Sequence, residues 1–495
     1  MNRSADDLRE IYGSVFKLAV ALTFLSAFAL TGCSQSGGGS RGESVTSGLD
    51  GADNPALAMS GSGYAFAVWD ELNTGTDVAA NSYVPLAEWG LIEFPAEVNG
   101  SGDSDSPDVA MPRFSQDALV VWRQTNQRGL AGVYARFFDG DENVWGDVYE
   151  IFVHEFGEYV FTPRVALDGR GNAVVVWVHK FYDDPTSPRF RVLASRFVAA
   201  EQTWTKPLRI DNADELGLDA LAPRIAMNER GSGVVSFLYM EDSETFQIYA
   251  ALLVPPFDLG DPVWSRPVAV GIIPPVESGN VAHNSHRASK TDDDESTIVW
   301  EQRVGETSSI YVNRNVPGEG WVGATRLGTG ERPDLATEVR GGDSIVVWTG
   351  NEEGEGEYDE ETHTLAPGPL LGTIYARALT RGEWQPTEIV HQEESATASS
   401  ARVAMGVEGD AMVVWILDDG ARDQSIIASH RIPGEGWEVA QPAEDDDGKA
   451  SSPLLATDFA GAYVLVWVRT DNLGVTDIWA ADYDPQNGWG LPQLP

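Results

Sequence analysis

The sequence predicts an all-β protein organised as a single β-propeller, a ring of four-stranded sheets called blades. Three observations predict it: an apolar segment closed by an aromatic residue recurs along the chain, a second Trp follows each copy, and no copy shows a helical periodicity. The chain has 495 residues, which is too long for one ordinary hydrophobic core but suits a repeat architecture. We expect about eight blades, with seven blades plus irregular pieces as the alternative.

The first part of each repeat opens at a Pro slot and ends in an unbroken apolar run. RVALDGRGNAVVVW, which ends at Trp177, is a clear copy. An apolar run of this kind is typical of a strand that is buried on both faces. The residues that close the eight copies are Trp69, Trp122, Trp177, Phe237, Trp300, Trp348, Trp415 and Trp467.

The second part of each repeat is a shorter apolar segment, then a turn, then another Trp. These residues are Trp89, Trp145, Trp204, Trp264, Trp321, Trp384, Trp437 and Trp489. With Trp479 and the seven Trp residues of the first set, they account for all 16 Trp in the chain. We therefore expect a propeller over residues 54–495, with repeats at about 54–100, 106–153, 162–212, 222–273, 285–328, 332–391, 400–443 and 452–495.

Residues 1–33 have the features of a lipoprotein signal peptide. A charged leader that contains Arg3, Arg9 and Lys17 precedes a mostly apolar run at 18–30, which is too short to span a bilayer as a helix. The run ends in LTGC at positions 30–33, which resembles a bacterial lipobox with Cys33 as the lipidated residue. Cys33 is the only Cys in the chain, so no internal disulfide can form. The alternative is an ordinary signal peptide with an unrelated Cys.

The Gly/Ser-rich segment at 34–53 predicts a flexible tether between the lipid and the propeller. Several acyl chains on one protein give durable membrane anchoring. By analogy with lipoproteins, Ser34 after the Cys favours the outer membrane, so we expect a lipid-anchored protein of the cell envelope. With 33 Lys+Arg against 76 Asp+Glu, the formal net charge is −43, which argues against a nucleic-acid partner. We expect a monomer.

The turns between the third and fourth strands carry a family resemblance. Ile432-Pro433-Gly434-Glu435-Gly436-Trp437 is one example, and Val316 to Trp321 repeats the pattern. These turns resemble degenerate Asp-boxes of the BNR/sialidase-like propellers, in which the Gly and Trp match while the Ser, Asp and Thr mostly do not. The resemblance implies a propeller fold over nearly the whole mature chain. In sialidases of this family, an arginine triad holds the substrate carboxylate, and a Tyr/Glu pair and an Asp perform the chemistry.

The residue after the Pro slot is the candidate ligand-binding position. It is an acid in copies two and six, Asp108 and Asp334. It is basic in copies three, four, five and seven, namely Arg164, Arg224, Arg287 and Arg402. Because the innermost strand of a propeller begins near the usual ligand face, these arginines are expected to surround the channel and bind an anion. The alternative is that they pair with nearby acids and orient the loops.

No catalytic set can be assigned from the sequence. Asp70, Glu301 and Tyr239 follow second strands, but each is a single polar residue at a strand end. We therefore expect a non-catalytic platform that binds a protein or a glycan on its channel face. The alternative is a glycan-active hydrolase or lyase of the sialidase-like type.

Neither a cofactor nor a metal is expected. The acidic turns at 139–143 and 444–448 could offer oxygen ligands to calcium, but they lack the EF-hand spacing and are equally typical of surface turns. His283 and His286 would need a third ligand to bind zinc. We expect them to lie in a solvated loop.

Overall fold

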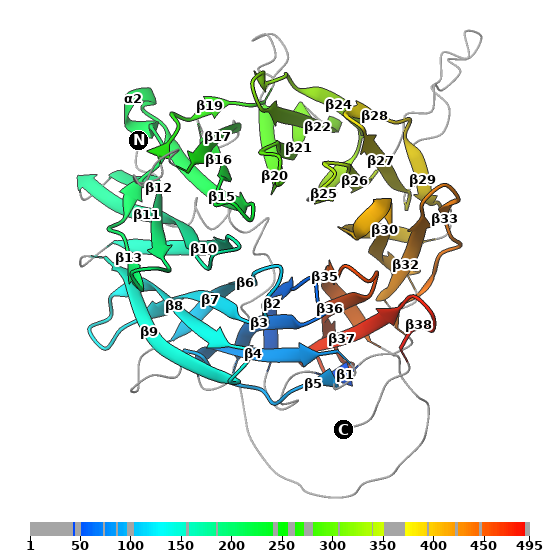
Figure 1. The fold of residues 1–495 in the computed structure, drawn as a ribbon, viewed down its shortest axis with the longest axis horizontal. Helices are drawn as coiled ribbons and strands as arrows, with labels where there is room; N and C mark the ends of the chain where they lie inside the picture. Colours follow the sequence, from blue (N-terminus) through cyan, green and yellow to red (C-terminus); the bar gives the residue numbers. More distant parts are fainter. Residues whose placement is uncertain are drawn as a thin grey trace, which may run out of the picture.

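The described strands of the computed structural model form seven sheets arranged as a ring, and the ten-stranded sheet joins two successive groups of strands through a parallel bridge between Gln424 and Lys449 (Figure 1). We call each of the six other sheets and each of these two groups a unit, and number the units from 1 to 8 in chain order. The structure describes residues 43–44, 51–72, 75–85, 88–96, 103–154, 158–184, 187–240, 246–255, 263–271, 281–304, 307–338, 340–350, 372–393, 396–420, 424–444 and 448–490.

The first strand of each unit lies innermost, and the second strand pairs beside it (Figure 1). The first strands are β2 (Gly51–Met59), β6 (Ser104–Ala110), β10 (Tyr159–Leu167), β15 (Asp219–Met227), β20 (Val281–Lys290), β25 (Glu331–Thr337), β30 (Thr397–Met405) and β35 (Lys449–Thr457). The second strands are β3 (Ala65–Leu72), β7 (Ala118–Thr125), β11 (Ala173–Asp184), β16 (Gly233–Met240), β21 (Ser296–Val304), β26 (Ser344–Thr349), β31 (Ala411–Asp418) and β36 (Tyr463–Thr470).

The third and fourth strands complete each unit toward the outside of the ring. The third strands are β4 (Thr76–Val84), β8 (Ala131–Asp139), β12 (Ser187–Val198), β17 (Phe246–Val254), β22 (Thr307–Val316), β27 (Ile374–Thr380), β32 (Gln424–Ile432) and β37 (Thr476–Asp484). The outermost strands are β5 (Glu88–Trp89), β9 (Val144–Val153), β13 (Thr203–Trp204) with β14 (Leu208–Arg209), β18 (Val263–Trp264) with β19 (Val268–Ala269), β23 (Gly320–Trp321) with β24 (Thr325–Thr329), β28 (Glu383–Trp384) with β29 (Glu388–His391), β33 (Gly436–Trp437) with β34 (Gln441–Pro442), and β38 (Gly488–Trp489).

The prediction of an all-β fold is confirmed. The described helical segments are α2 (Ala213–Leu216) and a short 3₁₀ helix, Val407–Gly409. None of the helices in the described part of the chain is long and apolar enough to cross a membrane. The sixth repeat has an insertion between its second and third strands, at 350–372, which falls mostly outside the described residues.

The repeated aromatic residue within each second strand is buried between neighbouring units. Trp177 of unit 3 packs in one cluster with Leu119 and Val121 of unit 2. Trp69 of unit 1 packs in the same way with Val464 and Val466 of unit 8, so the first and last units are in contact. The repeated Trp is therefore the residue that fills the space between sheets, as its large buried area favours.

The N-terminal strand β1 (Glu43–Ser44) completes unit 8. Ser44 pairs with Trp479 and Glu43 pairs with Ala480 on β37. In unit 3, the second outer strand β14 pairs with the equivalent two residues of β12. The tether predicted for 34–53 is thus too long, because Glu43–Ser44 and Gly51–Asp53 lie in strands.

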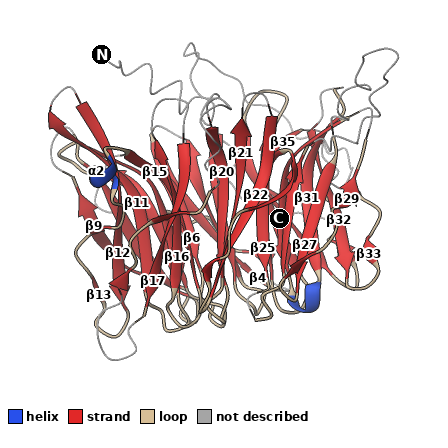
Figure 2. Cartoon of the chain, turned by 90° about the horizontal axis from the view of Figure 1, so that it is seen from above, coloured by secondary structure: helices blue, strands red, loops and turns tan. Residues whose placement is uncertain are grey.

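The ring has two faces, each carrying loops (Figure 2). The first strands begin at one face, which we call the entry face, and the connections between second and third strands lie there too. The first strands end at the opposite face, which we call the turn face, where tight turns lead into the second strands.

Candidate functional site

A bulge in each innermost strand sets the position of the candidate ligand-binding residue. The pairing of first and second strands shifts register just before that residue, for example between Phe161 and Arg164 in unit 3. The residue before the Pro slot has a positive φ in seven of the units, at Asn54, Ser106, Thr162, Ala222, Arg332, Ser400 and Ser452. A β-bulge bends its strand and redirects the side chain that follows. The bulge therefore sets the direction of the candidate side chain in each unit.

The structure brings the four predicted arginines into one electrostatic cluster, which we call the arginine ring: Arg164, Arg224, Arg287 and Arg402. Burial lowers the pKa of the Arg224 guanidinium well below its usual value, and the charges of Arg164, Arg287 and Arg402 lower it further. Burial also lowers the pKa of Arg402, to about 10. The arginines are therefore close enough for each charge to oppose its neighbours.

Two carboxylates share this level of the channel with the arginine ring. Asp334 accepts a hydrogen bond from Arg287 Nε at 2.9 Å. Burial raises the pKa of Asp108, while the charges of Arg164 and Arg224 oppose that rise. The structure therefore gives Arg287 a local acidic partner, as the alternative interpretation expected.

Arg224 differs from the other three arginines in having no such contact. Arg164, Arg287 and Arg402 each donate from Nη1 to the carbonyl of the preceding residue. The Arg224 side chain makes no hydrogen bond and no ion pair within the described part of the chain. Four guanidinium groups against two carboxylates leave a net positive charge here. A half-buried cation with no partner among the described residues raises the free energy of the folded protein. Binding of an anion beside it is therefore favourable.

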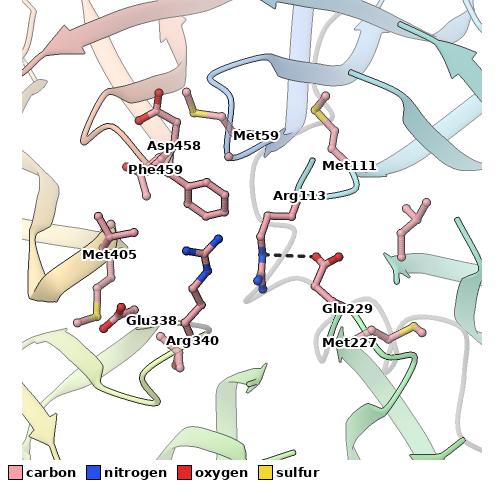
Figure 3. A pocket seen from close by; sticks show the side chains of 16 residues that line it. Met59, Met111, Arg113, Met227, Glu229, Glu338, Arg340, Met405, Asp458 and Phe459 are labelled. Atoms are coloured by element: carbon pink, nitrogen blue, oxygen red, sulfur yellow. Dashed lines mark hydrogen bonds and ion pairs between the residues drawn. The ribbon is translucent and has the colours of Figure 1, made fainter. Parts of the chain in front are cut away.

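A cavity of about 270 Å³ lies at the turn face, lined by residues from seven of the units (Figure 3). Its wall carries four methionines, Met59, Met111, Met227 and Met405, each three residues after the candidate position of its strand. At about 3.3 Å per residue, this wall lies about 10 Å from the arginine ring.

Side chains cross the ring at this cavity. Arg113 of unit 2 pairs with Glu229 of unit 4 at 3.4 Å (Figure 3). It also pairs with Asp292 of unit 5 at 2.8 Å. The Arg340 guanidinium of unit 6 lies 4.9 Å from the centre of the Phe459 ring of unit 8. These contacts tie unit 2 to units 4 and 5, and unit 6 to unit 8, across the turn face.

The turns that carry these residues are themselves interlocked. The Gly61 N–H donates to the Arg113 carbonyl at 2.8 Å, and the Phe459 N–H donates to the Gly61 carbonyl at 3.1 Å. A Cβ on Gly61 would lie 2.2 Å from the Phe459 ring, so only glycine fits there. Sequence reasoning missed this crossing because the partners are far apart in the chain.

The residues considered for catalysis have structural partners. The Tyr239 side chain is fully buried, and its hydroxyl donates to Asn212 Oδ1 at 2.7 Å. Burial raises the pKa of the Asp70 carboxyl to about 8, and the charge of Asp105 adds to the rise. The two Asp70 oxygens accept hydrogen bonds from Ser106 N at 2.9 Å and Asn54 Nδ2 at 3.2 Å.

The segments considered for metals do not form a cluster. The Asp139 carboxylate accepts the backbone N–H groups of Asp141 and Glu142, at 3.1 Å and 2.9 Å, so it caps its own turn. His283 and His286 both lie in β20 and not in the expected loop. Among the described residues, no group of three or more His, Cys, Asp and Glu side chains could hold a metal ion. Cys33 and 445–447 lie outside the described residues.

No protein-family model matches this chain, and no curated protein does. Solved structures similar to the chain include a lectin, BP39L from Burkholderia pseudomallei, with a TM-score of 0.47 and 11% identity over 80% of this chain and 99% of that one. The polysaccharide lyase Uly1 has a TM-score of 0.46 and 9% identity, covering 74% of this chain and 88% of its own. The Hadza microbial sialidase Hz136 has a TM-score of 0.36 and 13% identity, covering 74% of both chains. With TM-scores below 0.5, these similarities assign neither a ligand nor a reaction to this chain.

Proposed function

We propose that this chain is a lipid-anchored, eight-bladed β-propeller of the cell envelope that binds the anionic group of a protein or glycan ligand without catalysis. The observation that carries the proposal is the Arg224 guanidinium, which has no hydrogen bond or ion pair among the described residues, while the charges of three other arginines oppose its own and the charge of Asp108 offsets them in part. A ligand carboxylate or sulfate in the ring would supply the missing negative charge. Guanidinium groups bind such anions through paired, charge-assisted hydrogen bonds.

The titration experiment for this proposal uses the chain without its signal peptide. A set of acidic and neutral oligosaccharides and peptides is titrated by calorimetry. We expect acidic ligands to bind, and Arg224→Gln to weaken their binding at least about tenfold. Arg128→Gln is the matched control, because Arg128 is an exposed residue on the entry face outside the ring. Equal affinity of wild type and Arg224→Gln would overturn the proposal.

The alternative function, glycan hydrolysis or cleavage by a lyase, has one observation in its favour. Burial raises the pKa of the Asp70 carboxyl to about 8, so it holds a proton near neutral pH, as a general acid must. However, both Asp70 oxygens already anchor Ser106 and Asn54. Binding therefore accounts better for the geometry. Turnover of a fluorogenic glycoside that is lost in Asp70→Asn would instead establish the enzyme.

The membrane part of the proposal rests on the lipobox-like LTGC sequence at 30–33. Metabolic labelling with a palmitate analogue should mark the wild-type protein in the membrane fraction. Cys33→Ala should abolish the label while leaving the propeller folded. Equal labelling of both proteins would contradict lipid attachment at Cys33, without bearing on the arginine ring.

A further inference from the structure

Unit 3 carries the longest hairpin among the described second and third strands, because β11 and β12 each have 12 residues. Its end lies at the entry face, beside the start of β10. Tyr159 on β10 pairs with Lys180 on β11, which in turn pairs with Phe190 on β12. Directly paired residues point to the same face of a sheet, and Tyr182, two residues after Lys180, points there too. We call Tyr159, Lys180, Tyr182 and Phe190 the tyrosine platform.

The Lys180 ammonium lies among three aromatic rings of the tyrosine platform. Its Nζ is 5.5 Å from the centre of the Tyr159 ring, 5.4 Å from that of Tyr182 and 5.9 Å from that of Phe190. Within the described residues, this ammonium forms no hydrogen bond and no ion pair. Such a cation is notable in a chain with a net charge of −43, where acids outnumber bases. The rings fix its position, and no carboxylate among the described residues pairs with its charge.

The two tyrosines of the platform are exposed, whereas its base is buried. Tyr159 is 46% exposed and Tyr182 is 37% exposed. Phe190 is buried in an apolar cluster with Val178, Leu221 and Met240, which joins units 3 and 4. The exposed rings therefore stand on a packed base, which limits the conformational entropy that they lose when a ligand binds.

The outer edge of the same hairpin is closed to an added strand. The Phe190 N–H donates to Asp219 Oδ1 at 3.0 Å, and the Val192 N–H donates to Asp211 Oδ2 at 2.8 Å. An extended peptide that joined the sheet would need these N–H groups. Both carboxylates also pair with arginines, Asp219 with Arg189 and Arg191, and Asp211 with Arg209. The edge thus disfavours strand addition by a peptide, and the platform offers flat aromatic faces with one cation.

We propose that the tyrosine platform binds an acidic sugar residue of a glycan. The apolar face of the sugar would stack on Tyr159 and Tyr182, and its carboxylate or sulfate would pair with Lys180. The inference rests on the proposed function, because the platform and the arginine ring share the entry face. Tyr159 lies five residues before Arg164 on β10, so at about 3.3 Å per residue the two sites are about 16 Å apart along the strand. A glycan chain with several acidic residues can reach both.

The test compares tetragalacturonate, galacturonate, a neutral tetrasaccharide and a poly-glutamate peptide as ligands in calorimetric titrations. We expect tetragalacturonate to bind most tightly and the neutral sugar to bind weakly. Lys180→Met keeps the apolar stem but removes the charge, and it should weaken tetragalacturonate binding about tenfold. Tyr159→Ala and Tyr182→Ala should have similar effects. Leu473→Ala, at a side chain that is 88% exposed elsewhere, is the control and should change nothing.

Binding of galacturonate alone separates this inference from the proposed function. The monosaccharide should bind to the platform variants about as it binds to wild type, and should bind at least about tenfold more weakly to Arg224→Gln. If the platform variants bind tetragalacturonate like wild type while Arg224→Gln does not, the platform inference is wrong and the arginine ring stands. Tighter binding of poly-glutamate than of tetragalacturonate, or no binding of any acidic sugar, would also overturn the inference. Unchanged thermal midpoints of the exposed-tyrosine variants confirm that folding is not the cause.

Discussion

Asp108 and Asp334 make the same contact on opposite sides of the ring. Asp108 Oδ2 accepts the Val165 N–H at 2.9 Å, and Asp334 Oδ2 accepts the Val403 N–H at 3.0 Å. Each aspartate thus reaches from its own unit to the first strand of the next unit. The two occupy equivalent positions in units 2 and 6, which are four units apart.

A second pair of acids also accepts backbone N–H groups of the next unit. Asp70 of unit 1 accepts the Ser106 N–H at 2.9 Å, and Glu301 of unit 5 accepts the Arg332 N–H at 3.1 Å. Both acids follow the aromatic residue of a second strand, and both N–H groups belong to the bulge of the next unit. The contacts of units 1 and 2 thus recur in units 5 and 6. The recurrence indicates an approximate two-fold repeat of the ring, which Arg224 and Arg287 break because they have no basic counterparts four units away.

Removing either bridging aspartate should destabilise the chain. Asp108→Ala leaves the Val165 N–H without its acceptor, which costs about 1–3 kcal/mol of unfolding free energy. Asp334→Ala should cost more, because it also removes the partner of Arg287. Urea denaturation of the two variants measures the difference. Equal stability of Asp334→Ala and wild type would contradict the bridging role.

Removal of the positive charge should raise the free energy of unfolding at Arg224 and lower it at Arg287. Arg224→Met removes a half-buried cation that lacks an ion-pair partner among the described residues, so it should raise the free energy of unfolding by about 1 kcal/mol or more. Arg287→Met breaks the ion pair with Asp334 and should lower it. Thermal unfolding of both variants at low and moderate salt tests the contrast. A destabilised Arg224→Met protein would show that the cation has a partner in the free chain.

The sequence predicted the fold well because the interface between units is a local signal. A run such as AMVVW ending at Trp415 places one Trp in each space between sheets, and its recurrence reveals the repeat. The direction of the side chain after the Pro slot was also predictable, because one bulge sets it in each unit. The register alone therefore located Arg164, Arg224, Arg287 and Arg402.

The contacts of those arginines could not be predicted from the register. Arg287 of unit 5 pairs with Asp334 of unit 6, whereas Arg224 has no equivalent partner among the described residues, and both outcomes depend on geometry between units. Arg113 and Asp292 are 179 residues apart, yet they meet across the ring. The tyrosine platform depends on the strand register of Tyr159, Lys180 and Phe190, which could not be predicted from the sequence. The unusual length of the third repeat between its second and third strands was the signal that could have pointed to this hairpin.

Asp70 should make the stability of the chain fall as pH rises. Burial, reinforced by Asp105, raises its pKa from 3.8 to about 8 in the folded protein. The folded state therefore holds the proton more tightly than the unfolded state does. This contribution is complete below about pH 3.8 and is lost as pH rises through about 8.

Asp70→Asn tests this dependence. The amide keeps an acceptor for Ser106 N–H but cannot ionise. Its thermal midpoint, compared with that of wild type, should become relatively higher as pH increases from about 4 to about 8. A constant difference between the two proteins across that range would show that Asp70 does not titrate as the structure implies.

His430 should add a second pH dependence, at a different contact. A hydrogen bond to Asp410, with Nε2 and Oδ1 2.5 Å apart, raises the pKa of His430 above 6.5 despite its partial burial. A base with a raised pKa stabilises the fold fully below pH 6.5, and the contribution is lost as pH rises through the folded-state pKa. His430→Gln should be less stable than wild type near pH 6, and the difference in stability should shrink at higher pH. Titration of the His430 ring protons by NMR measures the pKa directly, and a value below 6.5 would contradict the expectation.

The β1 pairing predicts that a short N-terminal segment helps to hold the ring closed. Ser44 and Glu43 occupy the register on β37 that Arg209 and Leu208 occupy on β12. A chain that begins at residue 48 lacks β1 and leaves that part of β37 unpaired. It should unfold several degrees below a chain that begins at residue 41, because only the shorter chain loses the ladder hydrogen bonds. Both chains lack Cys33, so lipid attachment does not affect the comparison. If the two chains unfold at the same temperature, β1 contributes nothing to closure, and the other contacts between units 1 and 8, such as the packing of Trp69 and the Phe459–Gly61 hydrogen bond, join the first and last units.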